Sequence, residues 1–147
     1  MFLKITVLQG GFIMVEQLSI FAENTKGAMA KITSTVSDAG INLYNVVTND
    51  SAEFGIIRML TSDSEMAASL LTKEGYMCHI GKCIGVEIPD DIGSLSTLLS
   101  TITDAGINID YVYVSYSRDS KTPVAIIHAS GYAEIEECLS AKGYTLI

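Results

Sequence analysis

The sequence has no tryptophan, two prolines, three cysteines and two histidines among its 147 residues. An odd number of cysteines and the absence of a recognisable secretory leader argue against a disulfide framework and indicate a reducing cytoplasm. Nine Lys and Arg stand against 17 Asp and Glu, for a formal charge of −8. The few cations are not clustered, so we do not expect nucleic-acid binding. No run of about 20 apolar residues is present, so we do not expect a membrane span.

Motifs for catalysis, cofactors and metals are also missing. The chain has neither a phosphate-binding loop nor a dinucleotide fingerprint. Asp90 and Asp91 stand side by side, but no plausible nucleophile or partner base lies near them in the sequence. Cys78, His79 and Cys83 are of the types that bind zinc, but their spacing fits no standard site. We therefore expect no catalytic residues, no metal and no cofactor.

The sequence does contain an internal repeat, with two copies of one module. The pentapeptide Asp-Ala-Gly-Ile-Asn occupies Asp38 to Asn42 and occurs again 66 residues later, at Asp104 to Asn108. Upstream of the two pentapeptides, Gly27 matches Gly93 at the same spacing. Between glycine and pentapeptide, apolar residues recur at steps of three and four, which predicts an amphipathic helix. The glycine inside each pentapeptide suits the left-handed position that closes a helix.

The repeat predicts three parts: an N-terminal extension at 1–13, a first domain at 14–81 and a second domain at 82–147. The extension could supply an extra strand from Phe2 to Leu8. Only Gly81 and Lys82 separate the copies. A domain of about 65 residues is marginal alone, so we expect the halves to pack against each other or against a second chain, as in a homodimer.

Each copy reads strand, helix, strand, strand, helix, strand. Ser62, followed three residues later by Glu65, predicts a capping box at the start of the second helix. The order predicts the α+β class, with two ferredoxin-like βαββαβ units in tandem whose antiparallel sheets carry both helices on one face. The strands are expected at 17–23, 42–48, 54–60, 76–80, 83–88, 107–117, 124–129 and 144–147, and the helices near 28–39, 64–73, 93–105 and 132–141.

A glycine at a strand-to-helix loop is either a simple turn residue or part of a ligand site. Helix N-termini present N–H groups and partial positive charge to a carboxylate, and glycine lets a ligand approach the backbone. We expect Asn42 and Asn108 to lie next to these helix N-termini and to help hold an ammonium group. The candidate ligand-binding residues are Asn24, Thr25, Lys26, Gly27, Ala28 and Asn42 in the first copy, and Asp90, Asp91, Ile92, Gly93, Ser94 and Asn108 in the second.

These motifs resemble the ACT domain, a small regulatory module that binds amino acids in known members. The family pattern Asn-x-x-Gly, followed by a helix and Gly-(Ile/Val)-Asn, is matched by Asn24 to Gly27 with Gly40 to Asn42, and by Asp90 to Gly93 with Gly106 to Asn108. The likeness covers Met14 to Ile147 and is similar to stand-alone tandem ACT proteins. Departures are the loss of the usual loop proline, at Lys26 and Ile92, and an aspartate at Asp90.

The resemblance implies a site between modules that binds a free amino acid, and an allosteric sensor that acts on a partner metabolic enzyme. An interaction module with a vestigial site is one alternative. A small acylphosphatase-like enzyme is another, but it would have to use Arg58 or Arg118, and neither lies in a glycine-rich phosphate loop.

Overall fold

The computed structural model describes residues 5–7, 13–49 and 54–147, with side chains from 14–49 and 55–147. The chain forms two compact units. We call Glu16–Gly81 the N-terminal unit, and Lys82–Ile147 with the strand residues that precede Glu16 the C-terminal unit. Two long strands, β2 (Ile13–Glu23) and β5 (Met77–Glu87), contribute residues to both units.

The two units divide between Gly81 and Lys82, but the predicted break between two strands at these residues is wrong. Both residues lie inside β5. An extended strand accepts glycine at this position without a turn, and a Cβ atom on Gly81 would only touch the His79 ring at 3.7 Å. Glycine is therefore a weak marker of a boundary when its neighbours favour a strand.

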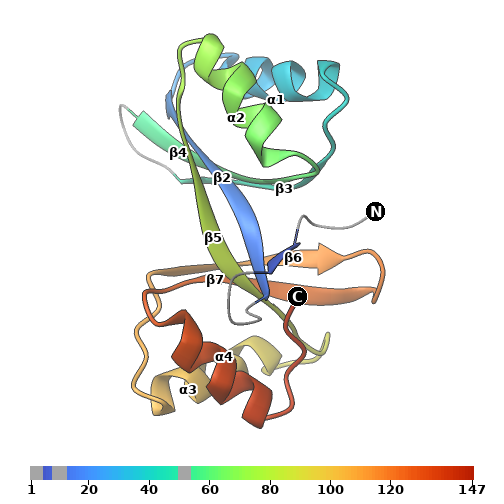
Figure 1. Ribbon diagram of the computed structural model, residues 1–147, viewed down its shortest axis with the longest axis vertical. Helices are drawn as coiled ribbons and strands as arrows, with labels where there is room; N and C mark the ends of the chain where they lie inside the picture. Colours follow the sequence, from blue (N-terminus) through green and yellow to red (C-terminus); the bar gives the residue numbers. More distant parts are fainter. Residues whose placement is uncertain (1–4, 8–12, 50–53) are drawn as a thin grey trace. The chain divides into compact units, whose positions relative to one another are not determined.

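In the N-terminal unit the strand order is β3 (Leu43–Asn49), β4 (Phe54–Thr61), β2, β5. Both β2 and β3 pair antiparallel with β4. The helices α1 (Ala28–Asp38) and α2 (Ser64–Lys73) cover one face of this sheet (Figure 1). Ile32 and Val36 of α1 are fully buried against Leu18 and Ile20 of β2, as the helical period predicted.

The start of α2 differs from the prediction. The capping residue is Asp63, whose carboxylate accepts a hydrogen bond of 2.9 Å from the Met66 N–H. The expected capping box of Ser62 with Glu65 is therefore wrong, because the Ser62 hydroxyl instead accepts from the Asn42 N–H at 2.9 Å. The hydroxyl joins the end of β4 to the residue before β3.

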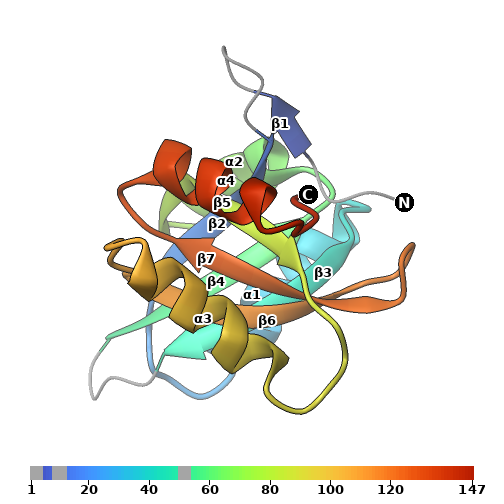
Figure 2. The same ribbon diagram turned by 90° about the horizontal axis from the view of Figure 1, so that it is seen from below.

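In the C-terminal unit β7 (Thr122–His128) pairs antiparallel with both β5 and β6 (Tyr111–Ser117). The predicted closing strand is reduced to a bridge between Leu146 and Val86. The helices α3 (Ser94–Asp104) and α4 (Tyr132–Ala141) lie on one face of the sheet (Figure 2). The α+β class with two tandem ferredoxin-like units is thereby confirmed.

Part of the predicted N-terminal extension forms a strand. β1 (Ile5–Val7) pairs antiparallel with Ile13–Val15 of β2. The rest of the extension, 1–4 and 8–12, and the turn from Asp50 lie outside the described residues. Met14 is buried within the core of the C-terminal unit, so this unit takes one of its core residues from the beginning of β2. No helix in the described part of the chain is long and apolar enough to cross a membrane.

Candidate functional site

The loop before α1 has a backbone shape set by Gly27, which takes φ of 86°. The Ala28 N–H donates to the Thr25 carbonyl at 3.2 Å, and the Lys31 N–H donates to the Gly27 carbonyl at 2.9 Å. The first N–H groups of an α-helix have no partner inside the helix, and no side chain caps α1. The helix N-terminus is thus open to an external acceptor, with the positive end of its dipole beside the loop.

A cavity of about 280 Å³ opens at this loop. It is lined by the end of β2, the loop, the start of α1, the end of β3 and part of β4. The glycine of β4 helps to keep it empty, since a Cβ atom on Gly55 would lie 3.2 Å from the Asn49 carbonyl oxygen. The lining residues are Ala22, Glu23, Asn24, Thr25, Ala28, Met29, Thr48, Asn49, Gly55 and Ile57.

The chemistry of this lining is mixed. Ala22 and Ile57 are 5% and 4% exposed and supply an apolar inner wall. Glu23 is the one residue of the lining with a formal charge, and Asn49 adds an amide at the end of β3. The N–H donors of the helix N-terminus, which can bind an anion, and the Glu23 carboxylate at the end of β2 therefore border the same cavity.

A second hollow, of about 270 Å³, lies on the other side of the same segment. It shares four lining residues with the first cavity and adds Phe21, Gly75 and Tyr76. Near Tyr76, at one end of this hollow, Lys31 forms an ion pair with Glu74. Its Nζ atom lies 3.2 Å from a Glu74 carboxylate oxygen and 5.9 Å from the centre of the Tyr76 ring. The Glu23 to Ala28 segment thus has open space on both sides.

The structure brings together only part of the predicted first-copy site. Asn24, Thr25 and Ala28 line the cavity, and Lys26 and Gly27 are exposed in the same loop. The expectation that Asn42 lies next to this helix N-terminus is wrong within the unit. The strands β2 and β3 run parallel because both are antiparallel to β4, so the end of β2 meets the end of β3 and not its beginning. The role of Asn42 in ligand binding stays a prediction.

Sequence reasoning missed the cavity residues from the strands. The topology places Thr48 and Asn49 at the cavity, because they end β3. A signal for one of the strand residues was available: Gly55 lies inside a predicted strand, where an isolated glycine often marks a close approach of backbone or ligand. The missed lining residues are Ala22, Glu23, Met29, Thr48, Asn49, Gly55 and Ile57.

The second loop has the same backbone shape. Gly93 takes φ of 87°, and the Ser94 N–H donates to the Asp91 carbonyl at 3.3 Å. Asp90, Asp91 and Ile92 are exposed. Asn108 lies before β6, and β6 runs parallel to β5, so Asn108 is at the far end of the sheet from Gly93. Ligand binding by this second set also stays a prediction.

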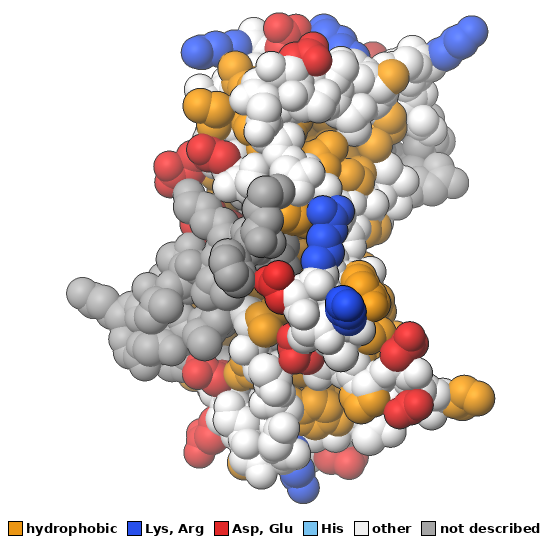
Figure 3. Space-filling view, turned by 90° about the vertical axis from the view of Figure 1, so that its right-hand side faces the viewer, with side chains coloured by type: hydrophobic (Ala, Val, Ile, Leu, Met, Phe, Trp, Pro, Cys, Tyr) orange, Lys and Arg blue, Asp and Glu red, His pale blue; other side chains and the backbone are white. Residues whose placement is uncertain are grey.

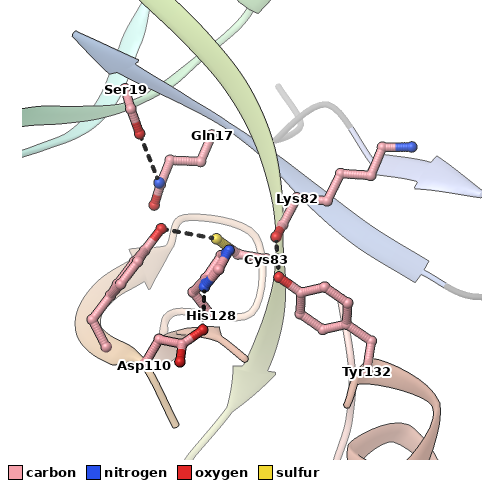
Figure 4. A network of polar contacts seen from close by, with 8 residues as sticks. Gln17, Ser19, Lys82, Cys83, Asp110, His128 and Tyr132 are labelled. Carbon is pink, nitrogen blue, oxygen red and sulfur yellow. Dashed lines mark hydrogen bonds and ion pairs between the residues drawn. The ribbon is translucent and has the colours of Figure 1, made fainter. Parts of the chain in front are cut away.

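A polar cluster forms at the other end of the C-terminal sheet. The Asp110 carboxylate lies 2.9 Å from His128 Nδ1, and the Tyr132 hydroxyl donates to the Lys82 carbonyl (Figure 4). His128 stacks on Tyr111 with ring centres 4.9 Å apart. Burial, followed by repulsion from the Cys83 thiolate, raises the pKa of Tyr132 to about 12. His128 also contacts Tyr132 edge to face, with ring centres 6.1 Å apart, so these contacts join the loop before β6 to the start of α4.

The residues considered for metal binding and phosphate chemistry form no such site in the described part of the chain. No group of three or more His, Cys, Asp and Glu side chains is arranged there to hold a metal ion. Arg58 lies inside β4, paired across the sheet with Ser19 and Val47. Arg118 lies in the exposed turn after β6, in the other unit.

The tandem ferredoxin-like units and their glycine-led helices define a protein of the ACT type. The ACT domain pair model matches residues 13–128, and the chain therefore belongs to the ACT domain pair family. A comparison with curated protein sequences gives no match.

Solved structures show the same fold. The chain is 28% identical to protein BT0572 from Bacteroides thetaiotaomicron, with a TM-score of 0.83 over 91% of this chain and 92% of that one. The ligand-free regulatory subunit of aspartate kinase from Thermus thermophilus is 15% identical, with a TM-score of 0.64 and coverage of 87% and 90%. Aspartokinase III from E. coli, in complex with lysine and aspartate, is 11% identical, with a TM-score of 0.51 and coverage of 87% and 31%.

Proposed function

We propose that this chain is a regulatory module that binds a free amino acid in the cavity of the N-terminal unit. The observation that supports it most directly is the pairing of an uncapped helix N-terminus with the Glu23 carboxylate around one cavity. An amino acid carries a carboxylate and an ammonium a few ångströms apart. The cavity offers a complement to each of these charges.

In this arrangement the ligand carboxylate accepts hydrogen bonds from N–H groups in the first turn of α1 beside Met29, since the Ala28 N–H already donates to the Thr25 carbonyl. Glu23 accepts from the ammonium group, together with the amide oxygen of Asn49. The ligand side chain lies toward the apolar wall that includes Ile57. Gly27 keeps the approach to the helix open, because a Cβ atom there would add bulk where the structure has nothing within 4 Å.

The family and two of the structural relatives support a regulatory role. The relatives include a regulatory subunit of aspartate kinase and an aspartokinase solved with lysine and aspartate. In our proposal, the bound amino acid stabilises one arrangement of the chain, and a partner metabolic enzyme in the cytoplasm responds to that arrangement. The regulatory assembly we propose is a homodimer, and the chain itself carries out no catalysis.

Isothermal titration calorimetry with a panel of free amino acids tests this proposal. At least one should bind in the micromolar to millimolar range, or about 4 to 8 kcal/mol. Glu23→Gln should weaken that binding about ten- to a hundredfold, because a charge-assisted hydrogen bond contributes roughly 1.5 to 3 kcal/mol. Glu65→Gln, the same change at an exposed position of α2 outside the cavity lining, is the matched control and should bind like the parent. A parent chain that binds no amino acid would contradict the proposal and favour an interaction module.

A further inference from the structure

The two copies share a loop backbone but differ in the side chains around it. Resting on the proposed function, we infer that the chain carries a single amino-acid site, in the N-terminal unit, and that Glu23 and Gly55 are the residues that distinguish it from its counterpart in the C-terminal unit.

Strand pairing fixes the equivalence. Ala22 is opposite Gly55 in the pairing of β2 with β4. In the second copy, Glu87 is opposite Val124, and one step further the Ile88 N–H donates to the Pro123 carbonyl at 3.0 Å. Ile88 therefore takes the place of Ala22, and Pro123 takes the place of Gly55.

The last residue of β2, Glu23, has an equivalent too. Glu23 follows Ala22, and Pro89 follows Ile88. The only two prolines of the sequence, Pro89 and Pro123, thus occupy the places of the cavity carboxylate and the cavity glycine. Proline at the first place removes the acceptor for an ammonium group. Proline at the second adds a ring where the first copy has no side chain.

Other equivalent positions change in the same direction. The register places Val114 where the first copy has Thr48, since Thr48 is opposite Ile57 and Val114 is opposite Ala125. In the loop, Ile92 replaces Lys26 and is fully exposed, at 108%. Figure 3 shows hydrophobic side chains exposed on one face of the molecule. The second copy therefore has an apolar side chain at both of these places.

The charges that remain oppose a ligand carboxylate. Asp90 and Asp91 lie in the loop before α3, separated from the N-cap Gly93 by Ile92. Carboxylates near this end of a helix are stabilised by its dipole, so they compete with a ligand for the partial positive charge of the helix N-terminus. Without an ammonium acceptor at Pro89, their negative charge also repels an incoming carboxylate.

The experiment is a stoichiometry measurement by calorimetry on the full chain, using whichever standard amino acid binds the parent tightest. We expect one molecule bound per chain. Gly55→Ala should weaken binding at least tenfold, because its Cβ atom would lie 3.2 Å from the Asn49 carbonyl oxygen and enter the cavity. The matched change at the equivalent place, Pro123→Gly, should leave affinity and stoichiometry unchanged. Circular dichroism and Tm confirm that each variant is folded.

The possible outcomes separate the inference from the proposed function. Two molecules per chain would overturn the inference and leave amino-acid binding intact. A loss of binding in Pro123→Gly, with unchanged binding in Gly55→Ala, would also overturn the inference and leave amino-acid binding intact. If Gly55→Ala does not fold, Glu23→Gln against Pro89→Ala gives the same comparison, with the loss expected only for Glu23→Gln. A parent that binds no amino acid overturns both proposals.

Discussion

Gly27 and Gly93 hold the same left-handed backbone conformation immediately before α1 and α3, with φ of 86° and 87°. A Cβ atom at either place would meet nothing within 4 Å, so the cost of adding one is conformational and not steric. Left-handed backbone costs a residue with a side chain roughly 1 to 2 kcal/mol. If the two loops have the same conformation, replacing either glycine by alanine should lower the free energy of unfolding by the same amount.

We predict that Gly27→Ala and Gly93→Ala each lower the free energy of unfolding by about 1 to 2 kcal/mol. Gly81→Ala is the control, because Gly81 lies in extended β5 and its Cβ atom would make an ordinary contact at 3.7 Å. It should cause no loss. Denaturant unfolding followed by circular dichroism gives the three values. Unequal losses at Gly27 and Gly93 would show that the loops are not built alike.

Tyr132 gives the C-terminal unit a dependence on alkaline pH. Its pKa is raised from an ordinary value of 10.0 to about 12, first by burial and then by the Cys83 thiolate. The raised pKa means that the fold favours the protonated hydroxyl. The stabilisation is complete below pH 10, where the unfolded chain also keeps the proton, and is lost as the pH rises toward 12.

We predict that the parent loses unfolding free energy between pH 9.5 and 11 more steeply than Tyr132→Phe, which has no proton to lose. Both proteins would be followed by urea unfolding at each pH. Spectrophotometric titration of the parent should show one tyrosine that ionises near pH 12 and is missing in the variant. Identical pH slopes in the two proteins would contradict this assignment.

At the scale of elements, the helices could be predicted from sequence almost to the residue, because local signals determine where helices begin and end. α2 and α4 were expected at 64–73 and 132–141, where they are found. What failed depended on contacts distant in sequence. The prediction divided β5 at Gly81 because each copy of the repeat was given a strand of its own, and nothing local shows that one strand serves two units.

The candidate site shows the same limit. The loop from Asn24 to Gly27 could be predicted, since its glycine and the following helix are adjacent in the chain. The residues that complete the cavity, Thr48, Asn49 and Gly55, come from β3 and β4 and depend on strand direction. The prediction placed the start of β3 at the helix N-terminus and so selected Asn42, but β3 runs parallel to β2 with β4 between them, and Asn42 lies at the opposite end of the sheet.

Helix α2 provides a prediction at this scale, because one side chain supplies its cap. Asp63→Ala should lower the free energy of unfolding by about 1 kcal/mol, since the Met66 N–H loses its acceptor. Asp63→Asn keeps an acceptor oxygen and should lose less. Thermal and denaturant unfolding of the two variants checks this. Equal losses would mean that the charge at the helix end matters more than the hydrogen bond.

At the scale of the whole molecule, the chain combines a repeated fold with unequal loops. The core positions recur between copies: Ile32 and Val36 of α1 correspond to Leu98 and Ile102 of α3, and all four are fully buried. The residues around the glycine loops do not recur, since Glu23 and Gly55 become Pro89 and Pro123. Packing thus constrains both copies alike, and we propose that ligand binding constrains only the first.

Amide NMR spectra of the ¹⁵N-labelled full chain, recorded during titration with the tightest-binding amino acid, test this central claim most directly. The account predicts saturable shifts centred on Asn24 to Met29 and on Thr48, Asn49 and Gly55, with the amides of Ile92 to Leu95 unmoved. Shifts of equal size at Gly93 would contradict the single site. Shifts centred on Asn42 or Asn108, with Asn24 to Met29 unmoved, would contradict the location of the site itself.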